Sequence, residues 1–435
     1  MSLGHSIGSL YVHVPFCAHK CSYCAFYSEA SSGELMERYT RALIRELELV
    51  ANDLRPQTVF FGGGTPSILT LKQWTAILRA MERLNLLGAI EWTVECNPAT
   101  VSLDKGRLWR DHGVNRISMG VQSLDDQMLD RLGRIHSRDM VFKSYDLLRR
   151  AGFENINLDL MFAIPGQTLD TWRATLDEAL ALGSEHLSCY EVIYEEDTPL
   201  FAQLAAGQIT PDEDRACAMY ETLLDRAAAA GFVQYEIANF ARDVSCRRRG
   251  NEAQISSNPS PSPYNSHAGF VTNDTQSIRV RDRLFPLPAG EGQGEGNSSI
   301  PSFACLHNIN YWRGGSYYGL GPSAAGYIRG RRTKNWSNTT LYCERLERGE
   351  RAIESVEELP PLKRAGETAA FGLRMNAGWP LADFRSATGF DLATEWRTEI
   401  SDLLHRGWGT LSTDNFRLTA TGLRFADSAA EMFLR

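Results

Sequence analysis

The stretch "YVHVPFCAHKCSYCAFYS", residues 11–28, joins a short apolar run to a group of thiols. Three of the chain's nine cysteines lie in it with the spacing C-x3-C-x2-C: Cys17, Cys21 and Cys24. Phe26 follows two residues after the last of them, where a fourth cysteine would continue the pattern. In a reducing compartment, thiols grouped in this way indicate metal or cluster binding, or redox chemistry, rather than a disulfide framework.

The number of thiols bears on what they bind. Thiolates suit zinc and iron–sulfur clusters. A structural zinc ion takes four protein ligands, so His13 or His19 would have to supply the fourth. His19 lies inside the x3 loop, where binding together with the cysteines is sterically awkward. A four-iron cluster held by three cysteines instead leaves one iron open to a ligand from outside the protein.

The composition is that of an ordinary folded protein, with 43% apolar and 23% charged residues in 435. This length predicts about two to three domains. The net charge of −8 disfavours a nucleic-acid partner, and no apolar run is long enough for a transmembrane span. The first ten residues show no secretion signal, so we expect a cytoplasmic protein.

The first half of the chain alternates short apolar runs with amphipathic stretches. The runs predict strands at 10–14, 58–61, 92–95, 116–121, 156–162 and 187–193, and the stretches predict helices at 34–53, 72–85, 138–151 and 168–182. Buried strands that alternate with helices form a parallel sheet with right-handed crossovers. A doubly wound sheet and an open barrel of the TIM type both satisfy this pattern.

In both architectures the active site forms at the carboxyl ends of the strands. Distinctive residues follow five successive strands: Cys17, then 62–65, then Glu95 and Asn97, then Gln122, then Pro165 and Gly166. In "FFGGGTPSIL" the glycines let the backbone approach a ligand closely and offer it N–H groups. These positions together predict one site at one end of the sheet.

Changes in composition predict four segments: a barrel at 1–244, an insertion at 245–304, a segment completing the core at 305–340, and a C-terminal domain at 341–435. The barrel would also include a helix near 211–230 and a strand at 235–240. The insertion is rich in Ser, Asn, Pro and Gly without periodicity, which predicts disorder, with a substrate lid as the alternative. The last segment predicts helices and a hairpin in a winged-helix-like order.

Six segments, in order along the chain, make a family resemblance specific: "YVHVPFC", "GGGTP", "ECNP", "RISMGVQS", "NLDLMFAIPGQT" and "GLGPSAAGY". With the cysteine spacing, they resemble the HemN/HemW branch of radical S-adenosylmethionine proteins, which holds oxygen-independent coproporphyrinogen III oxidases and related haem chaperones. The resemblance implies an α/β fold, an open, partial TIM-type barrel followed by a small, mostly helical C-terminal domain. It also implies a [4Fe–4S] cluster whose open iron binds S-adenosylmethionine and reduces it to a 5′-deoxyadenosyl radical.

The resemblance assigns residues to these groups. It implies that the cluster ligands are Cys17, Cys21 and Cys24. The positions that match contacts to S-adenosylmethionine are Tyr11, Tyr23, Gly63, Gly64, Thr65, Glu95, Gln122, Arg134 and Asp159. Some of the last three serve a second molecule in the oxidases. These residue types suit the task, because carboxylates take ribose hydroxyls and an arginine pairs with a carboxylate.

Two features separate oxidases from chaperones within the branch. The oxidases show the cysteine pattern C-x3-C-x2-C-x-C and carry an extension before the first strand. This sequence instead has Phe26 at the place of the fourth cysteine, and its first strand starts by residue 10. The chaperones show H-N-x-x-Y-W, present here as His307, Asn308, Tyr311 and Trp312. The motif is tied to haem binding in these proteins, and histidine is a common axial ligand of haem iron. His307 is therefore the expected ligand and Cys305 the second candidate, with a core histidine among aromatics as the structural alternative.

We therefore expect a chaperone that binds a cluster, S-adenosylmethionine and haem as cargo, and that passes haem to acceptor proteins. An electron donor is a further expected partner. If the protein is catalytic, the expected activity is that of a coproporphyrinogen dehydrogenase-type oxidoreductase. A radical enzyme that modifies RNA is disfavoured because the acidic chain shows no basic RNA-binding domain. A zinc-dependent interaction protein is the remaining alternative.

Overall fold

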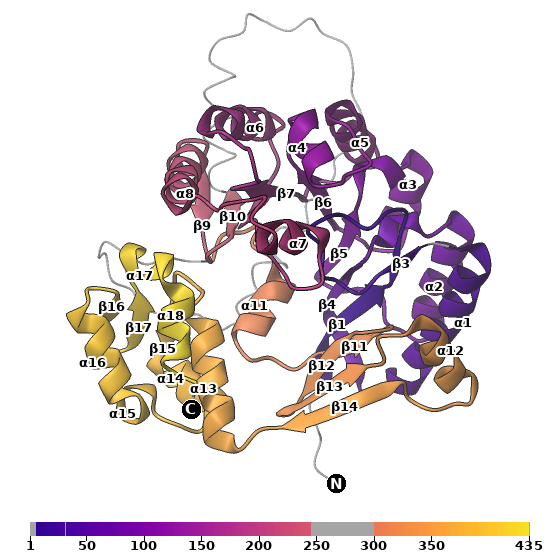
Figure 1. Ribbon diagram of the computed structural model, residues 1–435. Helices are drawn as coiled ribbons and strands as arrows, with labels where there is room; N and C mark the ends of the chain where they lie inside the picture. The colour runs from indigo at the N-terminus through magenta and orange to yellow at the C-terminus, as the bar shows by residue number, and fades with distance from the viewer. Residues whose placement is uncertain (1–5, 31, 245–299, 435) are drawn as a thin grey trace, which may run out of the picture.

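The computed structural model describes residues 6–30, 32–244 and 300–434, and its main feature is a nine-stranded sheet (Figure 1). The strand order is β11-β1-β4-β5-β6-β7-β8-β10-β9. The pairs from β11 to β8 are parallel, and the pairs of β10 with β8 and β9 are antiparallel. The strands are β1 (Ile7–Val14), β4 (Leu54–Gly63), β5 (Glu91–Cys96), β6 (Arg116–Gln122), β7 (Ile156–Phe162), β8 (His186–Glu191), β9 (Phe232–Gln234), β10 (Asn239–Arg242) and β11 (Tyr318–Leu320).

The strand order confirms the open barrel. Each strand from β1 through β4 to β8 lies beside the next along the chain, as in a TIM-type barrel and unlike a doubly wound sheet. Within the described residues, the edge strands β11 and β9 do not pair with each other, so the barrel stays open. All six strands predicted from apolar runs are present, several of them longer than predicted.

Helices connect and cover the strands of the barrel. They are α1 (Gly33–Val50), α2 (Leu71–Arg83), α3 (Leu103–Asp111), α4 (Asp126–Arg131), α5 (Arg138–Arg150), α6 (Leu169–Ala181), α7 (Pro199–Ala205) and α8 (Glu213–Ala229). The predicted helices correspond to α1, α2, α5, α6 and α8, whereas α3, α4 and α7 are too short to show a clear period. In α1, the residues predicted to share one face are all buried: Tyr39, Leu43, Leu47 and Val50.

Of the strand expected at 235–240, residues 239–240 begin β10, whereas residues 235–238 form the turn of the hairpin between β9 and β10. The Glu236 carboxylate accepts the N–H of Ala238 at 2.9 Å and also a hydrogen bond from the Asn239 side chain. A buried carboxylate that binds local donors in this way stabilises a turn rather than an extended strand. The apolar residues around it are buried in the turn, which is why the pattern resembled a strand.

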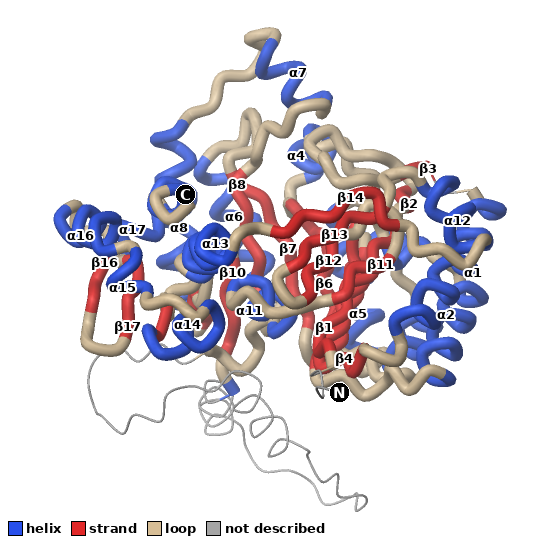
Figure 2. Tube along the Cα trace, turned by 90° about the horizontal axis from the view of Figure 1, so that it is seen from below, coloured by secondary structure: helices blue, strands red, loops and turns tan. Residues whose placement is uncertain are grey.

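Residues 300–434 add a helix to the barrel, a second sheet and a C-terminal unit. The helix is α11 (Leu306–Trp312), and the sheet joins β12 (Ala325–Ile328), β13 (Arg331–Asn335) and β14 (Ile353–Glu358). Helix α12 (Thr339–Glu347) packs on α1. Of the predicted insertion, residues 245–299 lie outside the described residues. Figure 2 shows α11 between the barrel and the C-terminal unit.

The C-terminal unit, residues 361–434, has its own core. Its elements are α13 (Pro361–Gly372), β15 (Trp379–Pro380), α14 (Leu381–Thr388), α15 (Leu392–Glu395), α16 (Arg397–His405), β16 (Gly409–Leu411), β17 (Asn415–Leu418), α17 (Ala420–Arg424) and α18 (Ala426–Glu431). The order of helices followed by a hairpin is the predicted one. Tyr342 and Cys343 of α12 belong to the barrel core, and the second core begins with Ala365. We propose that the unit starts at α13 rather than at residue 341.

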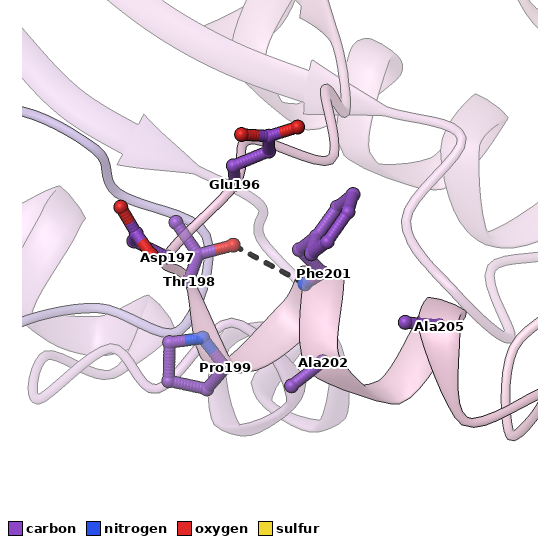
Figure 3. A pocket seen from close by; sticks show the side chains of 7 residues that line it. All are labelled: Glu196, Asp197, Thr198, Pro199, Phe201, Ala202 and Ala205. Carbon is purple, nitrogen blue, oxygen red and sulfur yellow. Dashed lines mark hydrogen bonds between the residues drawn. The ribbon is translucent and has the colours of Figure 1, made fainter.

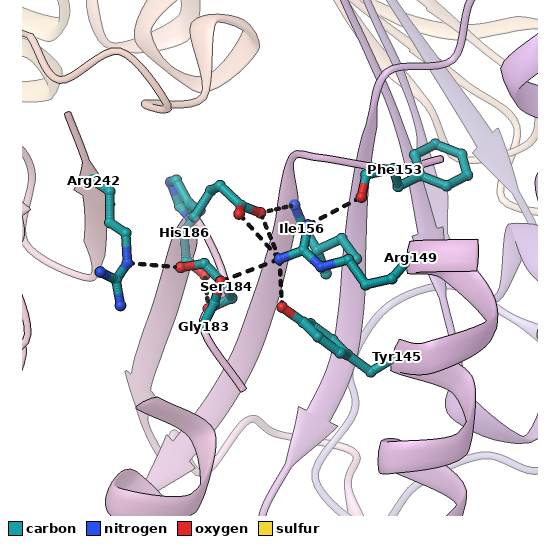
Figure 4. A network of polar contacts seen from close by, with 9 residues as sticks. Tyr145, Arg149, Phe153, Ile156, Gly183, Ser184, His186 and Arg242 are labelled. Carbon is teal, nitrogen blue, oxygen red and sulfur yellow. Dashed lines mark hydrogen bonds and ion pairs between the residues drawn. The ribbon is translucent and has the colours of Figure 1, made fainter. Parts of the chain in front are cut away.

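The amino-terminal ends of β7 and β8 are tied together by Glu185, a fully buried carboxylate (Figure 4). It accepts the backbone N–H of Ile156 at 3.0 Å and pairs with Arg149 at 3.0 Å. Arg149 also donates to the backbone oxygen of Phe153 at 3.0 Å, and its guanidinium lies over the Tyr145 ring. This end of the barrel is therefore held by polar contacts, opposite the carboxyl ends where the site is expected.

A second buried carboxylate, Glu46 of α1, connects the barrel to the segment after β11. It accepts hydrogen bonds from the N–H of Gly321 at 2.8 Å, from Asn335 at 2.8 Å and from the Tyr342 hydroxyl at 2.7 Å. Gly321 has φ of +95°, and a Cβ there would lie 2.2 Å from the backbone oxygen of His13. Glu46 thus fixes a chain segment that passes very close to β1, the strand that leads into the cysteines.

We expect Glu46→Leu to lower the free energy of unfolding by about 3 kcal/mol or more. Three buried donors lose their acceptor, and each such loss costs about 1–3 kcal/mol. Glu48→Ala on the same helix is the control, because its ion pair with Arg83 is exposed and such pairs contribute less than about 1 kcal/mol. Urea unfolding followed by circular dichroism measures both variants. Equal losses would show that the Glu46 contacts do not hold the segment.

Candidate functional site

The three predicted cluster cysteines are half-buried free thiols beyond the carboxyl end of β1. Cys17 ends the short strand β2 (Phe16–Cys17), and Cys21 and Cys24 follow before β3 (Glu29–Ala30). The Cys17 Sγ lies 3.4 Å from the Thr65 hydroxyl, and Arg134 donates to the Cys21 Sγ at 3.5 Å. Burial raises the pKa of the Cys24 thiol, and the neighbouring thiols add to this. The thiols therefore face residues from the turn after β4 and from the segment after α4.

Backbone contacts from two other segments hold the cysteine loop. Ser22 donates its N–H to the backbone oxygen of Leu132 at 3.0 Å, and its own oxygen accepts the N–H of Leu200 at 2.9 Å. A Cβ at Gly133 would lie 2.8 Å from the Ser22 hydroxyl, so the chain after α4 passes close to the loop. Phe26, by contrast, is 69% exposed. The loop is thus fixed in its middle and presents an apolar side chain to solvent near its end.

The glycine turn after β4 serves the cysteine loop directly. Gly64 donates its N–H to the backbone oxygen of Val14 at 2.8 Å, and Thr65 donates to that of Phe16 at 2.7 Å. The Gly63 N–H binds the Glu95 carboxylate. These N–H groups were expected to face a ligand, but in the structure all three have protein acceptors. The turn therefore positions the loop, and any ligand contact made by these residues remains a prediction.

Close packing explains why glycine is needed in this turn. Gly63 has φ of +101°, and a Cβ there would lie 2.5 Å from the His13 ring. A Cβ at Gly64 would lie 2.7 Å from the backbone oxygen of Phe16. Any larger side chain would push the turn away from the strand that precedes the cysteines.

Tyr11 and His13 of β1 form a short chain of hydrogen bonds beside the loop. The Tyr11 hydroxyl lies 3.1 Å from His13 Nδ1, and His13 Nε2 lies 2.9 Å from the backbone oxygen of Tyr27. Burial lowers the pKa of His13, which keeps the ring neutral. Both ring nitrogens are engaged, so binding of zinc by His13, the fourth ligand considered from the sequence, would require one of these two contacts to break.

Glu95 and Asp159 form an acidic pair inside the carboxyl end of the barrel. Burial, reinforced by the charge of Asp159, raises the pKa of Glu95 to about 8. Burial also raises the pKa of Asp159 to about 6, against the charge of Arg116 and hydrogen bonds from Asn157 at 2.7 Å and Ser118 at 3.1 Å. Two carboxyl groups at one wall suit hydroxyl or ammonium groups of a bound nucleoside or amino acid.

Gln122, Arg134 and Tyr23 complete the predicted set at the same end. Gln122 ends β6 with φ of 66°, a left-handed conformation that is uncommon for a residue with a side chain. Arg134 donates to the backbone oxygen of Gly120 at 2.6 Å as well as to Cys21. Burial raises the pKa of Tyr23, which interacts with Arg134. The structure thus brings together residues predicted separately from four strand ends.

A groove beside α7 opens near this end of the barrel (Figure 3). Its volume is about 600 Å³, and it is lined by Glu196, Asp197, Thr198, Pro199, Phe201, Ala202 and Ala205. The Thr198 hydroxyl caps α7 by accepting the N–H of Phe201 at 3.2 Å. The sequence did not predict this groove, because α7 has only seven residues and no clear period.

The H-N-x-x-Y-W motif lies elsewhere, on α11 inside the barrel. His307 is 1% exposed; its Nδ1 lies 2.9 Å from the Thr58 hydroxyl and its Nε2 lies 2.7 Å from the Tyr311 hydroxyl. The ring stacks on Phe60 with centroids 5.3 Å apart. Burial lowers the pKa of His307 to about 3. Asn308 is half-buried, and Trp312 points away from His307 toward the C-terminal unit. The motif is therefore split between the barrel and the unit beyond it.

Two buried residues that the sequence analysis missed organise the barrel interior. Glu91, 5% exposed, accepts the N–H groups of Leu306 at 2.8 Å and His307 at 2.9 Å, and so caps α11. Arg116, 2% exposed, donates to Thr93 at 3.4 Å and interacts with the Glu91 charge. A charged residue at the start of an otherwise apolar strand is the signal that marks both positions in the sequence.

Comparisons with known proteins agree with this arrangement. The family model of the Radical SAM superfamily matches residues 11–179, and that of the HemN C-terminal domain matches residues 359–425. The mitochondrial radical S-adenosyl methionine domain-containing protein 1 of Danio rerio is 30% identical over 85% of this chain and 73% of its own. The chain belongs to the radical SAM superfamily, in its HemN/HemW branch.

Two further similarities extend over nearly the whole chain. The heme chaperone HemW of Lactococcus lactis is 29% identical over 98% of this chain and 97% of its own. The solved structure of the coproporphyrinogen III oxidase HemN from Escherichia coli superposes with a TM-score of 0.74 at 18% identity, over all of this chain and 91% of that one. The second likeness concerns the fold, which matches in both the open barrel and the C-terminal unit.

The radical SAM family implies a [4Fe–4S] cluster and S-adenosylmethionine, and the cysteine loop fits the cluster. Within the part of the chain that the structure describes, no three His, Cys, Asp or Glu side chains converge closely enough to hold one metal ion. A single zinc ion requires such convergence. In a four-iron cluster each thiolate binds a different iron, so Cys17, Cys21 and Cys24 need only border a shared space. When bound, the cluster supplies one electron to S-adenosylmethionine.

We expect Gly64→Ala to reduce cluster incorporation and to lower the free energy of unfolding by about 1–3 kcal/mol. The added Cβ overlaps the backbone that leads into Cys17, and such overpacking has costs in this range. Iron content after anaerobic reconstitution and urea unfolding are the measurements. Gly33→Ala is the control, because its Cβ meets nothing within 4 Å at the start of α1. Normal iron content in Gly64→Ala would show that the turn does not position the loop.

The acidic pair predicts a pH-dependent stability. A carboxyl with a raised pKa in the folded state stabilises fully below its unfolded pKa, and this contribution is lost as the pH rises through the folded pKa. For Glu95 that window runs from about pH 4.3 to about pH 8, and the loss is on the order of 5 kcal/mol. We expect Glu95→Gln to remove most of the fall above pH 6, leaving the part due to Asp159 below it. Urea unfolding across this range tests the prediction, and parallel curves for both proteins would contradict it.

Proposed function

We propose that this radical SAM protein is a haem chaperone, which binds a [4Fe–4S] cluster, S-adenosylmethionine and haem and passes haem to acceptor proteins. The observation that carries the proposal is the H-N-x-x-Y-W motif on α11, in a chain similar to proteins named heme chaperone HemW over 98% of its length. Histidine and flat aromatic side chains are groups that bind haem iron and the porphyrin face.

Phe26 supports the chaperone over the oxidase. Phe26 occupies the place at which the pattern of the oxidases has a fourth cysteine, and its side chain is 69% exposed. The likeness to the solved oxidase concerns the fold alone, at 18% identity. Oxidation of coproporphyrinogen III is the alternative activity, and it is tested together with haem binding below.

His307 is the proposed haem ligand ahead of Cys305. The two ring nitrogens of His307 bind the neutral hydroxyls of Thr58 and Tyr311, and haem iron would replace one of these contacts. The Cys305 thiol instead lies 3.4 Å from the Glu91 carboxylate and is fully buried at the start of α11. Tyr311 and Trp312 would then contribute apolar surface, and Asn308 a polar contact.

The partners of the proposed function are haem acceptors and an electron donor for the cluster. We propose that the protein works in the reducing cytoplasm, where the thiols of the cysteine loop stay reduced. None of the helices within residues 6–30, 32–244 and 300–434 is long and apolar enough to cross a membrane.

We expect reconstituted protein to bind haem, and His307→Ala to weaken that binding about tenfold or more and to remove the absorbance of histidine-bound haem. Loss of even an outer-shell contact of a metal ligand costs about 10–100-fold in affinity. His112→Ala, which changes a half-buried histidine at the end of α3, is the control. If His307→Ala binds haem as tightly as the wild type with the same spectrum, His307 is not the ligand.

Two activity assays on the same preparation decide between the functions. The chaperone predicts transfer of bound haem to a haem-free globin offered as a probe acceptor, and no useful conversion of coproporphyrinogen III to protoporphyrinogen IX. Efficient conversion without haem transfer would replace the proposal by the oxidase. Metal analysis separates the zinc alternative, because a cluster gives about four irons per chain.

A further inference from the structure

The proposed haem ligand is enclosed in the structure, and this sets a condition on haem binding. His307 is 1% exposed, and both of its ring nitrogens have hydroxyl partners within 2.9 Å. An axial ligand must direct the lone pair of one ring nitrogen at the iron. A porphyrin therefore reaches His307 only after α11 or its surroundings have moved.

The amino-terminal end of α11 is held firmly by the barrel. Glu91 accepts hydrogen bonds from two backbone N–H groups of α11 and from the Cys305 thiol. Leu306 and Ile309 pack with Tyr235 and Ala241 in a small apolar cluster beneath the sheet. Movement of this end requires the loss of charge-assisted hydrogen bonds inside the barrel, so this end is the anchored one.

The carboxyl-terminal end of α11 is held by the C-terminal unit instead. Arg313 donates to the backbone oxygen of Gly378 at 2.7 Å, and its guanidinium lies 4.6 Å from the centroid of the Trp379 ring. Arg374 lies in the same way over Trp312, at 4.9 Å. In the first contact the arginine follows α11 and the ring belongs to the unit, and in the second contact the arginine belongs to the unit and the ring to α11. The unit therefore covers this end of the motif.

The joint between the C-terminal unit and the barrel combines polar contacts with unpaired polar atoms. Arg374 pairs with the buried Glu236 carboxylate at 3.8 Å, and the Asn376 side chain donates to the backbone oxygen of Gln234 at 3.0 Å. Among the residues that the structure describes, Trp312 Nε1, Arg374 Nε and Asn376 Oδ1 are buried without a hydrogen-bond partner. These three atoms belong to α11 or to the turn after α13. Burial of polar groups without partners destabilises the closed arrangement by a cost that opening to water removes.

Apolar contacts also cross the joint. Among the residues that the structure describes, Met375 is buried in the apolar cluster around α11, and Ile237 of the hairpin turn packs against the core of the C-terminal unit. Arg313 is a half-buried cation with no carboxylate within ion-pair distance in the same part of the chain, and burial lowers its pKa to about 10. Segments with few apolar contacts and under-satisfied polar groups open at lower free energy than the core around them.

We propose that the C-terminal unit is a cover over α11 that swings away to admit haem, with Arg313, Met375 and the Arg374–Glu236 ion pair among its contacts and Glu91 as the anchor that keeps the motif in place. This rests on the proposed function, because it assigns the regulation of the same site. In the closed state the unit covers the carboxyl-terminal end of α11, and the open state exposes Trp312 and that end, from which haem reaches His307. The observed affinity for haem then equals the intrinsic affinity reduced by the fraction of open protein.

The test weakens the contact between the C-terminal unit and α11 by a substitution outside the H-N-x-x-Y-W motif. In Arg313→Ala the cluster-loaded protein with S-adenosylmethionine is expected to bind haem about tenfold faster in stopped-flow mixing, because one charged hydrogen bond of the closed state is lost. The bound spectrum stays that of the wild type. Arg406→Ala is the matched control, since Arg406 lies over the Trp408 ring and pairs with Asp402 entirely within the C-terminal unit.

Amide hydrogen exchange measures how often the C-terminal unit opens in the absence of haem. We expect the amides of 309–312 and of 374–378 to exchange through one shared opening, faster in Arg313→Ala and unchanged in Arg406→Ala, while the anchored start of α11, β5 and β6 stay protected in all proteins. Independent exchange of the two segments, or equal haem association rates in Arg313→Ala and wild type, overturns the cover. If the two segments open together but the protein binds no haem, the result supports the cover and refutes the chaperone function instead.

Discussion

Two backbone hydrogen bonds, from Gly64 to Val14 and from Thr65 to Phe16, determine where the cysteine loop lies. They join the end of β4 to the strand that carries the loop, at a distance only glycine allows. The Gly63 N–H extends the connection to Glu95 on β5. Three neighbouring strand ends are thus fixed to one another by backbone groups. The cysteines inherit their position from this connection, which is independent of anything they bind.

The open barrel creates a second constraint, which α11 satisfies. An open sheet with polar residues on its inner face must pair those residues or leave them exposed to water. Here Asn157, His186 and Tyr235 bind one another in sequence, with His186 between the other two at 2.6 and 2.8 Å. The Tyr235 hydroxyl then accepts the N–H of Cys305 at 3.1 Å, next to the Glu91 cap. The motif helix is therefore as much a part of the barrel core as the strands.

The sequence predicted the open barrel, and there is a physical reason for this. Apolar runs and helical periods report burial, so the strands and the longer helices were found. Cys17, Glu95 and Gln122 lie at or beyond strand ends of one edge, because parallel strands end together, and their role in one site stays a prediction. The orientation of the Gly63–Gly64 N–H groups was not predictable, since whether a turn donates to a ligand or to its neighbour depends on packing. The position of His307 in the structure was not predictable either. A helix of seven residues has no period to detect, and Glu91, which caps the helix, lies 215 residues before Leu306 in the chain.

The enclosure of His307 is consistent with a carrier that must also release its cargo. A ligand with no partner in the empty protein would leave a buried polar group unsatisfied, at a cost of about 1–3 kcal/mol. Thr58 and Tyr311 remove that cost by binding the ring. If His307 is the haem ligand, as proposed, the same two hydroxyls would compete with the iron and would weaken its hold by as much as they stabilise the empty state. Under the proposed function this competition would favour delivery, because transfer to an acceptor requires that haem leave.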